Sequence, residues 1–182
     1  MAKVKFPVTP AIRLLREQDI TFSDHLYSYE SKGGTAASAR ELGVDEHAVI
    51  KTLIMEDDRK NPFICLMHGD RQVSTRELAR QIGARTVSPC HPDIAEKHSG
   101  YLVGGMSPFG TRKQLPVYLE ATILDLPKIF INGGKRGYLV GLNPQDLVFL
   151  LQPQLVHAAA EHSYPESTNR QENGTNHGHA VR

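Results

Sequence analysis

The mostly apolar run Val49-Ile-Lys-Thr-Leu-Ile-Met55 is followed by a second apolar run, Phe63-Ile-Cys-Leu-Met-His68. The segment between them, Glu56-Asp-Asp-Arg-Lys-Asn-Pro62, is polar and rich in residues that favour turns. Short apolar runs on either side of a polar turn predict two neighbouring antiparallel strands. The first of these strands contains a single charged side chain, Lys51.

Helix start and stop signals lie on both sides of this strand pair. Thr9-Pro10 predicts a helix N-terminus, because a threonine side chain caps the first turn and proline fits its first position. The capping box Ser74-Thr-Arg-Glu77 predicts another helix, which Gly83 ends. We expect helices over residues 9–18, 35–42, 74–82, 92–97 and 143–151.

Further short runs rich in β-branched and aromatic residues predict more strands. These runs cover residues 22–29, 117–120, 128–131 and 138–142. Helices and strands alternate along the chain without regular βαβ repeats. The expected fold class is α/β, with a mixed, mainly antiparallel sheet that curls into an open, β-barrel-like shape and is flanked by helices.

The length of 182 residues suits a single domain. We place this domain at residues 1–162 and expect residues 163–182 to form a disordered tail, because they are polar and contain few large apolar side chains. The N-terminus has no apolar stretch long enough for a signal peptide, and no segment approaches membrane-spanning length. Cys65 and Cys90 do not form a disulfide framework. These features predict a cytoplasmic protein without membrane contact.

Two glycine-rich runs, Gly100-Tyr-Leu-Val-Gly-Gly-Met-Ser-Pro-Phe-Gly110 and Ile131-Asn-Gly-Gly-Lys-Arg-Gly137, predict loops whose backbone is closely approached. Glycine-rich loops can turn their amide groups toward an anion or a carbonyl oxygen. Basic residues accompany both runs, with Thr111-Arg-Lys113 after the first and Lys135-Arg136 inside the second. We expect these loops to hold a phosphate or a carboxyl-derived oxygen.

Several familiar site types do not fit the residues present. Residues 105–110 have the glycine spacing of a P-loop, but Thr111-Arg112 stands where Lys-Ser or Lys-Thr is required. No Gly-x-Gly-x-x-Gly motif opens a helix after the first strand, so a dinucleotide fold is not supported. The nine histidines are scattered, and neither cysteine lies in a nucleophile signature. We therefore expect no metal, no cofactor and no protein nucleophile.

The net charge of +1 argues against a protein that binds nucleic acid through many phosphates, and we expect no DNA partner. Lys51 interrupts its apolar strand, where a half-buried ammonium group requires an acceptor or an anionic ligand. A lysine that faces solvent from a strand edge fits the same pattern. The residues alone leave both interpretations open.

The chain resembles the YbaK/ProX-type aminoacyl-tRNA deacylases in four segments that occur in the order of that family. These segments are Thr9-Pro-Ala-Ile-x-Leu-Leu, Lys51-Thr-Leu, the run from Gly100 to Gly110, and Gly133-Gly-Lys-Arg-Gly137. The resemblance covers residues 9–160 and is most specific in the two glycine-rich runs. It is strongest to the YbaK branch, whose members are Cys-tRNA(Pro) deacylases.

The resemblance implies a trans-editing enzyme that hydrolyses the ester between a wrong amino acid and the terminal ribose of a tRNA. In YbaK-like proteins the thiol of the cysteine substrate attacks its own carbonyl group and leaves as a cyclic thiolactone. The expected site has Lys51 and Gly104 as catalytic residues and, as substrate-binding residues, Tyr27, Thr52, Gly105, Ser107, Asn132, Gly133, Gly134, Lys135 and Arg136.

The chain departs from the YbaK pattern in three places. Asn132 stands where many relatives have serine, Leu139 stands where some have aspartate, and Ser31-Lys-Gly-Gly-Thr35 lacks an aromatic residue. These differences concern pocket shape and amino-acid preference. Deacylation of Ala-tRNA(Pro) by an activated water, and a non-catalytic module that binds tRNA ends or nucleotides, also stay open.

The partner that the resemblance implies is the 3′ end of an aminoacyl-tRNA. The near-neutral charge predicts weak binding of the tRNA body, because few phosphates can be neutralised. We therefore expect prolyl-tRNA synthetase to supply selectivity for the tRNA.

Overall fold

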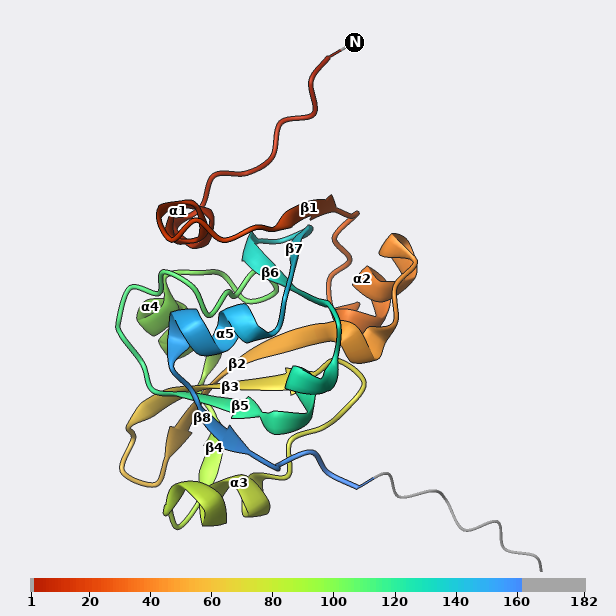
Figure 1. The fold of residues 1–182 in the computed structure, drawn as a ribbon. Helices are drawn as coiled ribbons and strands as arrows, with labels where there is room; N and C mark the ends of the chain where they lie inside the picture. The colour runs from red at the N-terminus through yellow and green to blue at the C-terminus, as the bar shows by residue number, and fades with distance from the viewer. Residues whose placement is uncertain (1, 162–182) are drawn as a thin grey trace, which may run out of the picture.

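An eight-stranded mixed sheet forms the centre of the molecule (Figure 1). The computed structural model describes residues 2–161. The strands are β1 (Ser23–Leu26), β2 (Val49–Asp57), β3 (Pro62–His68), β4 (Val87–Pro89), β5 (Val117–Glu120), β6 (Ile129–Lys135), β7 (Tyr138–Leu142) and β8 (Gln154–Val156). Their order is β1-β7-β6-β2-β3-β5-β8, with β4 paired to β2. Because β1 and β8 lie at opposite ends of this order, the sheet is not closed.

The predicted strand pair is confirmed as β2 and β3, which run antiparallel and pair Lys51 with Met67. Four strand pairs are antiparallel, namely β1–β7, β2–β3, β2–β4 and β6–β7. The pairs β2–β6, β3–β5 and β5–β8 are parallel. The predicted mixed, mainly antiparallel sheet is therefore confirmed.

The second edge of β2 is shared between two partner strands. Residues 49–50 pair with β6 and residues 55–57 pair with β4. Within residues 2–161, no strand pairs with residues 51–54 on that edge. The interruption coincides with a pocket, because every residue from 49 to 54 lines it.

All five predicted helices are confirmed, with capping side chains at three of them, namely Thr9, Ser74 and His91. The α-helices within residues 2–161 are α1 (Pro10–Glu17), α2 (Gly34–Leu42), α3 (Thr75–Ile82), α4 (Pro92–Ser99) and α5 (Gln145–Leu151), and the short 3-10 helices are η1 (Glu46–Ala48) and η2 (Ala121–Asp125). The Thr9 hydroxyl accepts a hydrogen bond from the Ile12 amide at 3.1 Å. The Ser74 hydroxyl accepts one from the Glu77 amide at 3.3 Å, and Gly83 ends α3 in the left-handed conformation.

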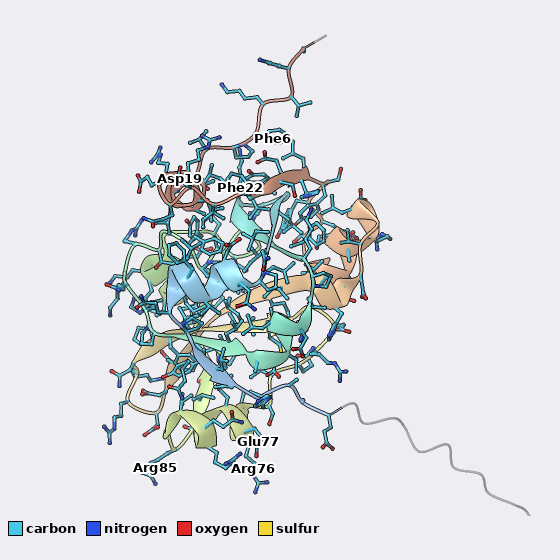
Figure 2. The ribbon with its side chains drawn as sticks, viewed as in Figure 1. Phe6, Asp19, Phe22, Arg76, Glu77 and Arg85 are labelled. Atoms are coloured by element: carbon cyan, nitrogen blue, oxygen red, sulfur yellow. The ribbon has the colours of Figure 1, made fainter. Side chains whose placement is uncertain are left out.

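Two clusters of buried apolar side chains pack on opposite faces of β2 and β3. Leu66 belongs to the main cluster, and its neighbour Met67 belongs to a second cluster that includes residues of α3. Phe6 and Phe22 pack against the main cluster and lie beside α1 (Figure 2). Successive side chains of a strand point to opposite faces, so adjacent residues of this strand pair contribute to different clusters.

The structure corrects the sequence-based prediction in three places. It contains β4 and β8, which were not predicted, and β1 is shorter than the expected strand at residues 22–29. The second glycine-rich run, expected as a loop, lies largely in β6, where the pairing with β7 is irregular between Asn132 and Lys135. The predicted tail at residues 163–182 lies outside the described residues. Within residues 2–161, no helix has the length and apolar character needed to cross a membrane.

Candidate active site

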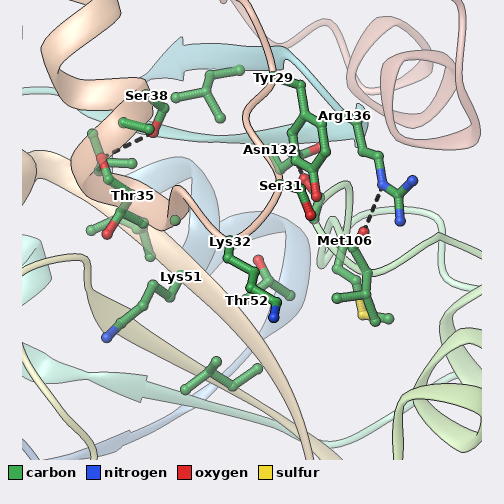
Figure 3. A pocket seen from close by; sticks show the side chains of 18 of the residues that line it. Tyr29, Ser31, Lys32, Thr35, Ser38, Lys51, Thr52, Met106, Asn132 and Arg136 are labelled. Atoms are coloured by element: carbon green, nitrogen blue, oxygen red, sulfur yellow. Dashed lines mark hydrogen bonds between the residues drawn. The ribbon is translucent and has the colours of Figure 1, made fainter.

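A pocket with a volume of about 600 Å³ lies at the interrupted edge of β2, where α2 and the two glycine-rich runs meet it (Figure 3). This size suits a small organic group bound in a cleft. Its lining includes six of the predicted site residues, namely Tyr27, Lys51, Thr52, Gly104, Asn132 and Arg136. The structure therefore brings together side chains that are more than 100 positions apart in the sequence.

Lys51 projects from the middle of β2 and is half-buried. It pairs with Met67, so its side chain points to the face of the sheet that carries the second cluster. Its ammonium group donates a hydrogen bond to the Arg71 carbonyl oxygen. Burial lowers the pKa of Lys51, while the carboxylates of Glu46 and Asp70 act in the opposite direction. Lys51 thus lines the pocket, while its ammonium group is held by a neutral acceptor outside the lining.

Thr52 follows Lys51 and points to the opposite face of the sheet, because it pairs with Leu66 of the main cluster. Within the described residues, its hydroxyl oxygen is the only buried side-chain N or O atom without a hydrogen-bond partner. An unpaired buried polar group costs about 1–3 kcal/mol. Thr52 lines the pocket, but this oxygen itself is buried, so a ligand that removes the cost would reach it only after the threonine side chain rotates.

Tyr27 lies directly after β1 and contributes a half-buried ring to the pocket. Its amide donates a hydrogen bond of 2.9 Å to the Gly137 carbonyl oxygen, at the turn between β6 and β7. Burial raises the pKa of the Tyr27 hydroxyl above its ordinary value of 10.0. The hydroxyl is therefore protonated at neutral pH and can donate a hydrogen bond to a ligand.

Asn132 connects the two glycine-rich runs. Its side-chain nitrogen donates to the Gly104 carbonyl oxygen at 3.2 Å. Its side-chain oxygen accepts hydrogen bonds from the amides of Gly134 at 2.7 Å and Lys135 at 3.1 Å. Arg136 adds a bond of 2.8 Å from Nε to the Val103 carbonyl oxygen, which Figure 3 shows as a dashed line. The two runs form one wall of the pocket.

Gly104 presents backbone to the pocket in a conformation that other residues adopt poorly. It is exposed and has a φ of +89°. Within residues 2–161, its amide forms no hydrogen bond, and its carbonyl oxygen is held by Asn132. An unpaired amide at a pocket wall can stabilise negative charge on a ligand oxygen.

Five predicted substrate-binding residues do not line the pocket: Gly105, Ser107, Gly133, Gly134 and Lys135. Ser107 is fully buried, and its hydroxyl accepts a hydrogen bond from the Phe109 amide at 3.2 Å. A Cβ atom on Gly133 would lie 2.7 Å from the Tyr138 ring, and one on Gly134 would lie 2.6 Å from the Tyr101 ring. These positions require glycine because the wall is packed closely behind the pocket surface.

The apolar part of the lining was not predicted. It includes Ile50, Ile54, Cys90, Ala95 and Met106. Cys90 is 8% exposed, and its sulfur lies 3.8 Å from a carboxylate oxygen of Glu56. Burial, together with the Glu56 carboxylate, raises the pKa of this thiol to about 11, so it is not an activated nucleophile. Met106 lies in the first glycine-rich run, but the other four belong to no motif, because any core position can have the same residue types. No group of three or more metal-ligating side chains occurs within residues 2–161.

A Gly105→Ala substitution is expected to destabilise the protein by about 2–3 kcal/mol. The new Cβ atom would lie 2.7 Å from the Arg136 amide nitrogen and 2.9 Å from the Lys135 carbonyl carbon, and backbone atoms cannot move aside cheaply. Gly83→Ala is the control, because it adds a methyl group in open space and costs only the strain of a φ of +76°, about 1 kcal/mol. Urea denaturation measures both. Equal stabilities of the two variants would show that the two glycine-rich runs do not pack as described.

The sequence model of one protein family, described as an aminoacyl-tRNA editing domain, matches residues 30–150. A protein named "Putative Cys-tRNA(Pro)/Cys-tRNA(Cys) deacylase EbsC", from Enterococcus faecalis, is 27% identical over 147 residues, which cover 80% of this chain and 90% of that protein. A proline–tRNA ligase from Streptococcus equi subsp. zooepidemicus is 30% identical over 104 residues, which cover 57% of this chain and 17% of the ligase. The similar segment is therefore a small part of the ligase.

Two solved structures have the same fold. The crystal structure of "hypothetical protein APE2540" superposes with a TM-score of 0.76 and 20% identity, covering 84% of this chain and 100% of that one. The crystal structure of "a putative trans-editing enzyme for prolyl tRNA synthetase" has a TM-score of 0.73 and 20% identity, covering 85% of this chain and 100% of that one. The predicted fold, a sheet flanked by helices, is shared with both.

Proposed function

The chain belongs to the aminoacyl-tRNA editing domain family, and from this premise we propose that it removes cysteine from mischarged Cys-tRNA(Pro) in trans. Family membership makes it an aminoacyl-tRNA deacylase. The choice of cysteine is supported by the name of the Enterococcus faecalis relative, which is 27% identical. The choice of tRNA(Pro) is supported by that name and by the similar segment in proline–tRNA ligases.

One observation carries the mechanism that we propose. Among the described residues, the pocket lining contains a half-buried lysine and an unpaired glycine amide but no histidine or aspartate. Its only thiol, Cys90, has a pKa raised to about 11. Its only carboxylate, Glu30, is paired with Arg40 at 3.0 Å on the surface. Such a site can orient a substrate and stabilise charge. The one lining hydroxyl that is bonded to a carboxylate, Thr35 Oγ1 to Glu46 at 2.8 Å, is also bonded to the Gly69 carbonyl oxygen at 3.1 Å.

In the proposed reaction the cysteine substrate supplies the nucleophile. Its sulfur attacks the ester carbonyl carbon, and the bond between that carbon and the ribose oxygen breaks. The ribose oxygen takes up the proton that the thiol loses. The products are a tRNA with an intact 3′ end and a cyclic thiolactone of cysteine. Cysteine suits this role because a few per cent of a thiol with an ordinary pKa is ionised at pH 7.

The protein contributes orientation and electrostatic stabilisation in this proposal. The Gly104 amide and the Lys51 ammonium group, once it leaves the Arg71 carbonyl oxygen, are the donors for the negatively charged oxygen that forms when the carbonyl carbon is attacked. Tyr27, Thr52, Asn132 and Arg136 bind the substrate around it. Gly105, Ser107, Gly133, Gly134 and Lys135 support this wall from behind, which accounts for their positions outside the pocket lining.

In this proposal, another protein recognises the body of the tRNA. A chain with a net charge of +1 can neutralise few phosphates, so its intrinsic affinity for tRNA is low. We infer that prolyl-tRNA synthetase presents the mischarged tRNA to the enzyme in the cytoplasm. The low affinity would restrict the chain's own contacts to the 3′ end.

Single-turnover deacylation of purified Cys-tRNA(Pro) tests the proposed function. The expected result is loss of the ester together with release of the cysteine thiolactone, identified by mass spectrometry. Ala-tRNA(Pro) is run alongside. Hydrolysis of the alanine ester at a similar rate would favour an activated water instead. No turnover of either substrate would favour a non-catalytic module that binds tRNA ends.

A further inference from the structure

We propose that Tyr29 and Arg136 form a stacking platform at the pocket mouth for the 3′-terminal nucleobase of the tRNA. This inference rests on the proposed function, because the aminoacyl group must occupy the pocket when the terminal nucleoside lies at its mouth. Tyr29 is not among the residues that the resemblance assigns to the site. Arg136 is among them, but only as a basic residue of a loop.

The Tyr29 ring is available to a ligand. The residue is 40% exposed and lines the pocket. Within residues 2–161, its hydroxyl group forms no hydrogen bond, so the hydroxyl does not hold the ring in place. It is fixed by packing against Gly104, where a Cβ atom would lie 2.6 Å from the Tyr29 hydroxyl oxygen and 2.9 Å from a ring carbon. Because Gly104 has no side chain, the Tyr29 ring can pack directly against it, beside the Gly104 amide that is the proposed oxyanion donor.

Arg136 completes the platform. Its guanidinium carbon lies 5.3 Å from the centre of the Tyr29 ring, which is a cation–π distance. Its Nε is bound to the Val103 carbonyl oxygen at 2.8 Å, so the orientation of the guanidinium plane is set. Figure 3 shows Tyr29, Asn132 and Arg136 close together at one side of the pocket. An aromatic ring and an oriented guanidinium group are the two surfaces on which unpaired bases stack.

The surroundings of the platform fit the end of an RNA strand. Leu102 and Val103 are apolar and 58% and 44% exposed, and they can cover the faces of a nucleoside. Lys32 lines the pocket and is exposed, so it can reach a phosphate. The nearest acidic neighbour in sequence, Glu30, is already paired with Arg40. This combination of aromatic, apolar and basic groups is typical of sites for single-stranded nucleic acid.

An RNA minihelix with the tRNA(Pro) acceptor stem and 2-aminopurine in place of its terminal adenine tests this proposal. Stacking quenches 2-aminopurine fluorescence, so the assay reports binding of the terminal base without any ester hydrolysis. We expect wild-type protein to quench the probe. Tyr29→Leu should weaken binding roughly tenfold, while Tyr29→Phe should bind as wild type, because the hydroxyl is not used.

Arg136→Gln is a second test, because it removes the charge from an exposed side chain and leaves the core intact. It should weaken binding and reduce the salt dependence of the affinity. Phe149→Leu and Arg80→Ala are matched controls on α5 and α3, where both residues are exposed. Both should bind as wild type. Thermal unfolding of every variant checks the fold.

The proposal is overturned if Tyr29→Leu and Arg136→Gln quench the probe as strongly as wild type. It is equally overturned if Tyr29→Phe binds the probe as weakly as Tyr29→Leu. It is also overturned if wild-type protein deacylates Cys-tRNA(Pro) without quenching the probe. Quenching without deacylation supports the platform and argues against the enzyme. The failure of one proposal can therefore be told from the failure of the other.

Discussion

Replacing the cysteine of Cys-tRNA(Pro) by serine is expected to slow single-turnover deacylation by at least about 100-fold. The two esters differ only in one atom, sulfur or oxygen. A hydroxyl group is far less ionised at neutral pH than a thiol, so serine loses the intramolecular nucleophile while it keeps the size of the side chain. The only thiol of the described pocket lining does not replace it, because burial raises the pKa of the Cys90 thiol to about 11.

A competition assay with Ser-tRNA(Pro) distinguishes a slower chemical step from weaker binding of the substrate. Ser-tRNA(Pro) should inhibit deacylation of Cys-tRNA(Pro) with an affinity close to that of the substrate, since a single-atom change in a small pocket costs little binding energy. Poor competition would mean that the pocket rejects serine before any chemistry occurs. Equal deacylation rates for the two esters would contradict the substrate-thiol mechanism and favour an activated water.

The sequence predicts the local elements of this fold well, because the signals that define them are local. The Thr9 and Ser74 caps form the hydrogen bonds that their motifs indicate. The polar turn at residues 56–62 joins β2 and β3 as expected. Strands β4 and β8 were not predicted, because each has three residues and is defined by pairing with a strand that is distant in the sequence.

The sequence also indicates which residues gather at the pocket, but not what each of them does there. Lys51 and Thr52 are neighbours in the motif, yet strand alternation sends their side chains to opposite faces of the sheet. Gly133 and Gly134 belong to the most specific motif. In the structure, the ring of Tyr138 packs against Gly133 and the ring of Tyr101 packs against Gly134. A motif indicates that a position needs a particular residue. The structure is needed to tell whether that residue contacts a ligand or a neighbouring side chain.

A Lys51→Met substitution is expected to lower the single-turnover rate with Cys-tRNA(Pro) by about 100-fold, which corresponds to the loss of one good oxyanion donor. Lys51 is the only lysine or arginine of the described pocket lining that is not exposed, because Lys32 and Arg136 both face solvent. A charge in a half-buried position acts through a lower dielectric than a charge at the rim. Methionine keeps the apolar stem and removes only the ammonium group.

The same substitution should not unfold the protein, and this distinguishes a catalytic role for Lys51 from a structural one. The ammonium group is bound to the neutral Arg71 carbonyl oxygen, and burial lowers its pKa, so folding gains little from this charge. Urea denaturation of Lys51→Met should therefore give a free energy of unfolding within about 1 kcal/mol of wild type. Lys97→Met is the control, since Lys97 is exposed and outside the pocket lining. A Lys51→Met enzyme that deacylates at the wild-type rate would remove Lys51 from the mechanism and leave the Gly104 amide as the main donor.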